Sequence, residues 1–207
     1  MPRKYAILVA LALSVVLVDQ VTKYFVLADL TYTFDETPGA GGRLGLFFSQ
    51  APAIGYDGYH YRSKQAVTVS ENFLRLRYAE NPGAAFGLFR QLPEGARGPL
   101  FHLVSIGAVV LISFYFSKLS GTKKEERWAL WGLPLVLGGA IGNYLDRLAR
   151  GFVIDFLEAH WFDKVGLTWP SFNVADMAIC VGVGMLVVDS FVRKEKPKAK
   201  VAPKVNA

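Results

Sequence analysis

Residues 98–117 read GPLFHLVSIGAVVLISFYFS and residues 128–145 read WALWGLPLVLGGAIGNYL, and neither run contains Asp, Glu, Lys or Arg. Two further runs are nearly as apolar: 5–28 holds two charged residues and 165–188 holds one. A mostly apolar run of about 18 or more residues can cross a bilayer as a helix. Four such runs exclude an ordinary soluble domain and a disordered chain, and they predict a membrane protein.

Basic residues gather at the ends of these runs. Twelve of the 23 Lys and Arg residues lie there: Arg3, Lys4, Lys118, Lys123, Lys124, Arg127, Arg193, Lys194, Lys196, Lys198, Lys200 and Lys204. Such flanks mark the cytoplasmic side, so both termini and the 118–127 loop are expected there, with 29–97 and 148–171 outside. The net positive charge is weak evidence for a nucleic-acid partner, because the basic residues are not interleaved with aromatic residues and no motif that reads a nucleic-acid groove accompanies them.

The predicted fold class is an all-α membrane protein with a bundle of four transmembrane helices. The spans are expected at about 5–28, 98–118, 128–147 and 172–192, within a single membrane domain covering 1–207. No small-x-small cleavage site follows the first apolar core, so it is expected to be an uncleaved span and not a signal peptide. The basic tail 193–207 is predicted to be a disordered cytoplasmic end.

The outer segment 29–97 is different in kind. Apolar and polar residues alternate in Val-Thr-Val-Ser at 67–70 and in Phe-Leu-Arg-Leu-Arg-Tyr at 73–78, a period that favours short strands. A β-rich extracytoplasmic insert, forming a small β-sheet subdomain on the membrane, is predicted. Residues 153–163 mix apolar, aromatic and acidic positions, which predicts a periplasmic interfacial segment.

Cys180 is the only cysteine. It excludes an intrachain disulfide and a thiolate metal cluster. Because it lies within the fourth apolar run, it is predicted to be a small buried apolar residue.

Polar clusters interrupt the apolar runs, where a charged side chain costs about 2.5–3.5 kcal/mol at the bilayer centre. Asp19 and Lys23 are spaced i,i+4, which predicts an ion pair on one face of the first helix. Gly138 and Gly142 form a G-x-x-x-G, a helix-packing pattern in membranes. Asn143 follows within the same helix, and Asp146 and Arg147 share its face.

Two more aspartates stand out. Asp155 has apolar residues on both sides and no adjacent basic residue. Asn173 and Asp176 have the spacing of a capping arrangement at a helix start. The sharper interpretation is that Asp176 also points into the bundle and meets Asp155. Asn81 begins an Asn-Pro-Gly turn, where its side chain is expected to hydrogen-bond a backbone.

Two carboxylates in contact share one proton, because both cannot ionise readily. One then serves as a base on water, and the other donates a hydrogen bond to a scissile carbonyl. The chain has no H-E-x-x-H zinc pattern and no G-x-S-x-G elbow. From the residues alone, a proton or ion pathway competes on equal terms with hydrolysis, and a purely structural role for the clusters is a third reading.

These clusters together resemble the lipoprotein signal peptidase (signal peptidase II) family. The matching pieces, in the family's order, are Asp19-Gln-x-Thr-Lys23, Asn81-x-Gly83-Ala-Ala-Phe86, Gly138-Gly-Ala-Ile-Gly-Asn143-x-x-Asp146-Arg147, Val153-Ile-Asp155-Phe156 and Phe172-Asn173-x-Ala175-Asp176. Each piece alone is weak, whereas the set is highly specific and covers most of the chain outside the insert and the tail.

The resemblance implies an aspartic endopeptidase of the bacterial inner membrane, with its active site toward the periplasm. Its expected partners are bilayer lipid and a prolipoprotein whose lipobox cysteine carries diacylglyceryl, cut just before that cysteine. The antibiotic globomycin is the expected inhibitor, and no metal or organic cofactor is implied. The family's catalytic pair falls on Asp155 and Asp176. Supporting or substrate-binding positions fall on Asp19, Lys23, Asn81, Gly83, Asn143, Arg147, Asn173 and Ala175; Asp146 is expected to be structural.

The chain departs from the family pattern in two places. Pro82 stands where a small polar residue is more usual, and residues of about 35–70 resemble an insertion. The insertion puts substrate preference in doubt, so a paralogue with a narrowed set of client lipoproteins is a further possibility.

Overall fold

The computed structural model describes residues 2–37, 39–49, 63–83, 93–159 and 169–193. Within these ranges the elements are α1 (Arg3–Leu30), α2 (Ala40–Ser49), β1 (Val67–Ser70), β2 (Leu74–Asn81), α3 (Glu94–Lys118), the short 3-10 helix η2 (Lys124–Glu126), α4 (Arg127–Arg150), β3 (Val153–Ala159) and α5 (Val174–Val192). The four predicted apolar runs all form helices, at α1, α3, α4 and α5.

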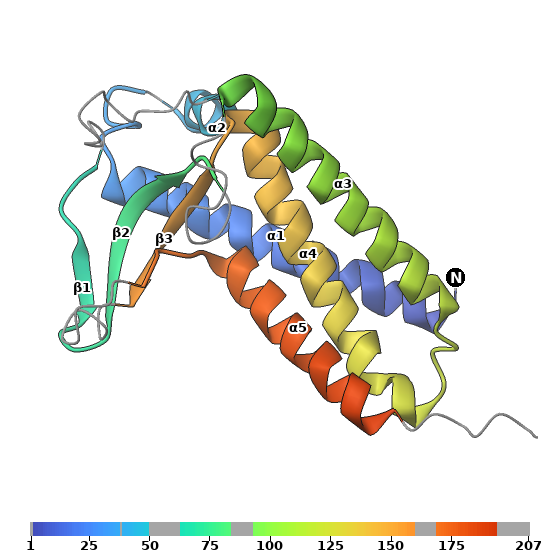
Figure 1. Cartoon of the computed structure of the whole chain (residues 1–207). Helices are drawn as coiled ribbons and strands as arrows, with labels where there is room; N and C mark the ends of the chain where they lie inside the picture. Colours follow the sequence, from blue (N-terminus) through green and yellow to red (C-terminus); the bar gives the residue numbers. More distant parts are fainter. Residues whose placement is uncertain (1, 38, 50–62, 84–92, 160–168, 194–207) are drawn as a thin grey trace, which may run out of the picture.

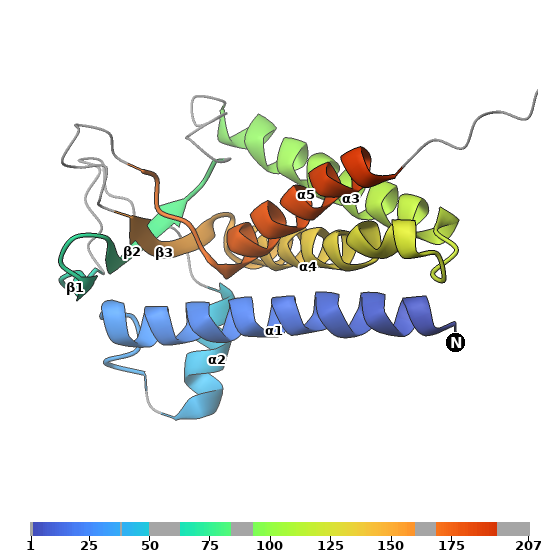
Figure 2. The ribbon, with the colours of Figure 1, turned by 90° about the horizontal axis from the view of Figure 1, so that it is seen from below.

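Helix α4 is the centre of the bundle. It packs against α1, α3 and α5, with α1 along one side and α3 and α5 along the other (Figures 1 and 2). The small sheet lies at one end of the bundle, next to the end of α1 and the start of α5 (Figure 1). Each end of α4 therefore meets a different environment: a loop at its start and the sheet at its end.

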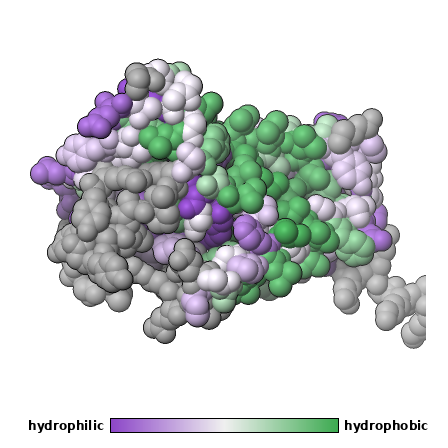
Figure 3. Space-filling model, turned by 90° about the horizontal axis from the view of Figure 1, so that it is seen from above, coloured by the Kyte–Doolittle hydropathy of each residue, from purple (hydrophilic) through white to green (hydrophobic). Residues whose placement is uncertain are grey.

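Three of these helices are long and apolar enough to cross a membrane: α1, residues 98–118 of α3, and α5. Hydrophobic residues cover much of the helical part on the face shown in Figure 3. The predicted count of four spans is thus confirmed only in part, because α4 does not meet the same apolar criterion within the described chain. The composition of α4 accounts for this, because its glycines and Pro134 lower the mean hydropathy and it carries Asn143, Asp146 and Arg147 near its end.

The glycines of α4 permit close helix packing, as the G-x-x-x-G pattern predicts. A methyl group on Gly138 would lie 2.8 Å from the carbonyl oxygen of Ala12 on α1, and one on Gly142 would lie 2.8 Å from Asp19 Oδ2. Gly139 faces the opposite side and meets the backbone of Ala175 on α5. Small residues at such crossings let backbones approach within a membrane.

A matched pair of glycines on α5 tests this packing. A methyl group on Gly182 would lie 2.6 Å from both the Gly132 carbonyl oxygen and a methyl carbon of Val136, whereas one on Gly184 meets nothing within 4 Å. We expect Gly182→Ala to lower the unfolding free energy by about 1–3 kcal/mol through overpacking. Gly184→Ala should leave the unfolding midpoint in detergent unchanged or slightly raised. Equal midpoints for the two variants would contradict a tight α4–α5 contact.

The sheet has strand order β1-β2-β3 with antiparallel pairing throughout. Its strands β1 and β2 confirm the alternation at 67–70 and 73–78. Residues 153–159, the first part of the predicted interfacial segment, form β3, because their backbone pairs with β2 from Leu74↔Ala159 to Asn81↔Val153. Ala79 lies opposite Asp155 in this register, which brings Asn81 close to that carboxyl group.

Two further predictions need correction. The insert is not purely β-rich, since residues 40–49 form the helix α2. Cys180 is exposed and not buried, because α5 packs against α4 along only part of its surface. Three predicted segments lie outside the described residues: residues 84–86 of the motif 81–86, residues 160–163, and the tail from 194 onward. The prediction of a disordered tail therefore stays untested.

Candidate active site

The start of α5 fixes one of the two candidate aspartates. Asn173 is the N-cap of α5: its side-chain oxygen accepts a hydrogen bond from the Asp176 amide at 3.0 Å, and Asp176 Oδ2 accepts one from the Asn173 amide at 3.1 Å. This is the capping arrangement that the sequence predicts. The second carboxylate oxygen, Oδ1, accepts a hydrogen bond from Asn143 Nδ2 of α4 at 2.8 Å. Both oxygens of Asp176 are therefore held in place.

Asp155 approaches the same place from β3. Its side chain is nearly buried, with an exposed fraction of 3%. Asn173 Nδ2 donates to Oδ1 at 2.7 Å, and Asn81 Nδ2 donates to Oδ2 at 2.9 Å. Asn173 thus donates a hydrogen bond to both carboxyl groups, to Asp155 through its side-chain amide and to Asp176 through its backbone amide.

Burial and the nearby charge of Asp176 raise the pKa of Asp155 to about 7. The hydrogen bonds from Asn81 and Asn173 lower this pKa, but by less than the other two effects raise it. Burial raises the pKa because it disfavours the ionised form, and a second carboxylate does the same by repulsion. Asp155 therefore retains its proton up to neutral pH. Two interacting carboxyl groups with one proton between them are a candidate acid–base pair.

Both aspartates line one cavity of about 700 Å³. It opens between β2, α4, β3 and α5, and it also borders residues 169–172, which lead into α5. Much of its wall is apolar, with Trp169, Phe172, Met177 and Ile179 among the lining residues. A cavity of this kind, apolar with a few converging polar groups, suits a ligand that has both an apolar part and a polar part.

Arg147 lies on the α4 side of the cavity. Its Nη2 donates to the Gly83 carbonyl oxygen at 3.0 Å, and its guanidinium carbon lies 4.7 Å from the centre of the Phe101 ring. The Gly83 amide in turn donates to Asn81 Oδ1 at 3.0 Å. Arg147 and Asn81 therefore hold the turn after β2 from two sides, next to Asp155.

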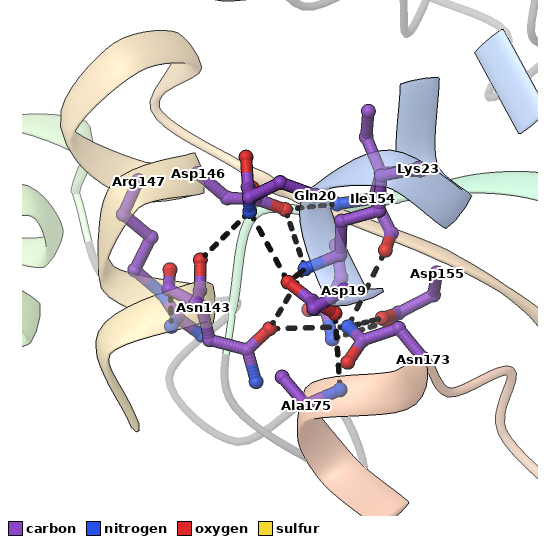
Figure 4. A network of polar contacts seen from close by, with 12 residues as sticks. Asp19, Gln20, Lys23, Asn143, Asp146, Arg147, Ile154, Asp155, Asn173 and Ala175 are labelled. Atoms are coloured by element: carbon purple, nitrogen blue, oxygen red, sulfur yellow. Dashed lines mark hydrogen bonds and ion pairs between the residues drawn. The ribbon is translucent and has the colours of Figure 1, made fainter. Parts of the chain in front are cut away.

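A buried network lies behind the aspartates (Figure 4). Lys23 Nζ contacts Asp19 Oδ2 at 2.7 Å and Asp146 Oδ2 at 2.9 Å, and the side chains of all three residues have an exposed fraction of 0%. The predicted Asp19–Lys23 pair is thus confirmed. Lys23 also donates to Asn143 Oδ1 at 3.2 Å, which leaves the amide of Asn143 directed at Asp176. The side chain of Asn143 therefore connects Lys23 with Asp176.

The same network holds the backbone of the surrounding elements. Asp19 Oδ1 accepts a hydrogen bond from the Ala175 amide at 3.0 Å, and Asp146 Oδ2 accepts one from the Ile154 amide at 3.1 Å. These two amides belong to the residues directly before Asp176 and Asp155. Asp19 and Asp146 therefore position the two chain segments that carry the candidate pair.

The residues predicted for the site divide into two groups. Those that line the cavity are Asn81, Gly83, Asn143, Arg147, Asp155 and Asp176; those behind it are Asp19, Lys23, Asn173 and Ala175. Sequence reasoning missed Gln20, whose amide donates to Asp146 Oδ1 at 2.8 Å, and Arg150, which binds Asp146 and the Phe47 carbonyl oxygen. The i,i+4 spacing of Asp146 and Arg150 is a signal that could have found the second.

Comparison with known proteins gives a consistent result. Residues 11–192 match the family model described as signal peptidase (SPase) II. A lipoprotein signal peptidase of an Anaeromyxobacter species is 42% identical over 95% of this chain and 90% of its own length. A lipoprotein signal peptidase of Syntrophotalea carbinolica is 44% identical over 60% of this chain and 72% of its own length.

Two solved structures share the fold. A bacterial membrane enzyme determined at 2.3 Å resolution superposes with a TM-score of 0.60 and 25% identity, covering 91% of this chain and 92% of that one. A second, determined at 1.9 Å, has a TM-score of 0.61 at 23% identity, covering 91% and 94%. This likeness concerns the fold; the family-model match over residues 11–192 and the 42% identity to the Anaeromyxobacter protein show that the chain belongs to the signal peptidase II family.

Proposed function

We propose that this protein removes the signal peptide from prolipoproteins by aspartic chemistry, with Asp155 and Asp176 as the catalytic pair. The supporting observation is that the two carboxyl groups come from different elements, share Asn173 as a hydrogen-bond partner and line the same cavity. Family membership makes the chain a peptidase, and its three apolar helices make it a multi-pass membrane protein.

In the proposed reaction the pair starts with one proton, which Asp155 carries, while Asp176 is ionised. Asp176 accepts a proton from a water molecule, which attacks the scissile carbonyl carbon. Asp155, protonated because of its raised pKa, donates a hydrogen bond to the carbonyl oxygen as negative charge develops there. The tetrahedral intermediate then breaks at the C–N bond, and the proton taken up by Asp176 passes to the leaving amine. The pair returns to its starting protonation state, so no covalent enzyme intermediate forms.

The cavity suits a lipid-modified peptide. We propose that the peptide backbone lies across the polar side formed by Asn81, Gly83 and Arg147, while the diacylglyceryl group of the cysteine rests on the apolar side near Met177 and Ile179. Cleavage falls just before that cysteine. Helix α4 is the fourth span in this proposal, its polar end lying at the outer membrane surface of a bacterial inner membrane, with both termini in the cytoplasm.

A cleavage assay tests the proposal. The purified protein, in detergent or lipid, is mixed with a diacylglyceryl-modified prolipoprotein, and loss of the signal peptide is followed by gel shift. We expect cleavage that globomycin blocks and none of the unmodified precursor. Absence of cleavage by folded protein across several prolipoproteins would contradict a broad processing role and leave the narrow-client paralogue. A proteoliposome assay for proton flux then tests the pathway reading.

The pH dependence of cleavage should follow the ionisation of the Asp155 carboxyl group. Since burial and Asp176 raise its pKa to about 7, the protonated form is present below that pH and is lost above it. We expect kcat/KM to fall on the alkaline side of pH 7, approaching about tenfold per pH unit. Asn81→Ala removes a hydrogen bond that lowers this pKa, so the alkaline limb should move to higher pH. A wild-type profile that stays flat from pH 6 to pH 9 would contradict Asp155 as the acid.

A further inference from the structure

Helix α2 is an element that the proposed reaction does not use. It is ten residues long and only Phe47 is buried among its side chains. Leu44 and Phe48 expose 51% and 45% of their surface, although both are apolar. They are spaced i,i+4 and therefore share one face of the helix. This apolar face, Leu44 and Phe48, has no covering element among the described residues.

The attachment of α2 to the bundle is specific. The Phe47 ring packs on Tyr24 of α1 with a centroid distance of 5.6 Å, and it lies under the guanidinium group of Arg150 at 4.5 Å. Arg150 Nη1 also donates to the Phe47 carbonyl oxygen at 2.7 Å, within a buried environment. Figure 2 shows α2 beside the sheet end of α1, on the side away from α5. These contacts fix the direction in which Leu44 and Phe48 point.

A chain of aromatic rings connects this face with the apolar surface of α1. Phe48 contacts Phe47 at 4.8 Å, Phe47 contacts Tyr24, and Tyr24 contacts Phe25 at 6.0 Å. Phe25 exposes 57% of its surface, and Val21 and Val18, one and two turns earlier, each expose about half. That part of α1 belongs to a membrane-capable helix, so its exposed apolar residues face lipid. The α2 face continues this lipid-facing surface.

The depth of α2 is also right for the membrane interface. At about 1.5 Å per residue the 28 residues of α1 span about 42 Å, against a hydrocarbon thickness of about 30 Å. A centred helix projects about 6 Å beyond each boundary. Tyr24 precedes the end of α1 by six residues, or about 9 Å. The contact with α2 therefore lies at the hydrocarbon boundary, where interfacial helices bury about 5–10 Å of their apolar face.

We infer that α2 is an interfacial helix that inserts Leu44 and Phe48 into the lipid layer at the sheet end of the bundle. Arg43 and Ser49 are exposed and remain at the headgroup or water side. The insertion in this chain thus provides a second, lateral contact with the membrane beside the spanning helices. Through Arg150 and Asp146, the lipid-bound helix is joined to the buried network behind the site.

Site-directed spin labelling tests this inference on the full-length protein in lipid vesicles. In a Cys180→Ser background, a nitroxide is attached at Leu44→Cys or Phe48→Cys. Ser49→Cys on the neighbouring side of α2 is the matched control, and Phe25→Cys is the lipid reference. Collision rates are measured with oxygen, which concentrates in lipid, and with a water-soluble nickel chelate. Unfolding midpoints of all four labelled proteins verify that each is folded.

The expected result is a ratio of oxygen to nickel collisions at Leu44 and Phe48 that is several-fold higher than at Ser49 and close to that at Phe25. A ratio equal to that of Ser49 would place the face in water and overturn the inference. Low collision rates with both reagents, with spin–spin broadening that disappears on dilution with unlabelled protein, would show a second copy covering α2 and would overturn it as well. Neither outcome depends on cleavage activity.

Discussion

Asp155→Asn and Asp176→Asn are each expected to reduce cleavage of a diacylglyceryl-modified prolipoprotein by about 10³-fold or more. The amide has the shape of the carboxyl group but cannot take up or release a proton at neutral pH. General acid and base groups contribute about 10²–10⁴-fold each, and the two aspartates act together in the same step, the attack of water on the carbonyl group. For this reason the double variant should be scarcely worse than either single variant.

Asp189 provides a matched control for these two variants. Asp189 lies on α5, as Asp176 does, and is also buried, where it accepts a hydrogen bond from the Ala129 amide and pairs with Arg193. It lies at the opposite end of the bundle and does not line the cavity. Asp189→Asn therefore removes a buried carboxylate without touching the proposed chemistry, and it should retain cleavage once its folding has been verified.

Cleavage by Asp155→Asn or Asp176→Asn at a rate close to that of the wild type would rule out the aspartic pair. Loss of activity in all three variants would point to a general effect of removing buried charge. The proton-pathway reading makes a different prediction, because it requires flux in proteoliposomes that depends on Asp155. Cleavage by the wild type with no such flux would exclude that reading.

The helices were predictable because their signals are local. The length and apolar character of the runs fix α1, α3, α4 and α5, and the spacing of Asn173 and Asp176 fixes the start of α5. The pairing of Asp19 with Lys23 follows from helical geometry alone. The placement of Asp155 and Asp176 in one cavity is non-local, since it depends on how β3 pairs with β2 and on how α5 packs against α4. The residues alone offered it as one interpretation among others, and the family resemblance assigned the pair.

The features that the sequence did not show depend on contacts between distant parts of the chain. Three glycines in residues 40–49 favour loop, yet α2 forms because Phe47 packs among aromatic rings and Arg150 binds its carbonyl group. Residues 153–159 become a strand through pairing with β2, more than seventy positions earlier. The exposure of Cys180 could not be predicted, because the hydropathy of a mostly apolar helix does not show which of its faces meets a neighbour.

Lys23→Met is expected to lower the free energy of unfolding by about 3–5 kcal/mol, the cost typical of breaking a buried ion pair from one side. Lys23 has no exposed side-chain surface and stands between Asp19 and Asp146, at 2.7 and 2.9 Å. Without its ammonium group, two carboxylates face each other in a space that water does not reach. Asp146 keeps Arg150 as a partner, whereas Asp19 loses its counter-charge.

A surface pair in the same chain is the comparison. Lys64 Nζ lies 3.3 Å from Asp35 Oδ1, but their side chains are 29% and 49% exposed, and such pairs contribute about 0–1 kcal/mol. We expect Lys64→Met to leave the unfolding midpoint in detergent nearly unchanged. If Lys23→Met proved equally mild, the buried network could not be what holds the two catalytic segments.

The double variant Asp19→Asn/Lys23→Met separates charge from packing. An asparagine at position 19 can still accept the hydrogen bond that the Ala175 amide donates to Asp19 Oδ1, and it leaves no uncompensated charge there. We therefore expect the double variant to be more stable than Lys23→Met alone, with a coupling free energy of about 0.5–3 kcal/mol in the thermodynamic cycle. Cleavage should recover less than stability, because Asn143 still lacks the ammonium group that directs its amide toward Asp176. Full recovery of both would mean that Lys23 serves only to neutralise Asp19.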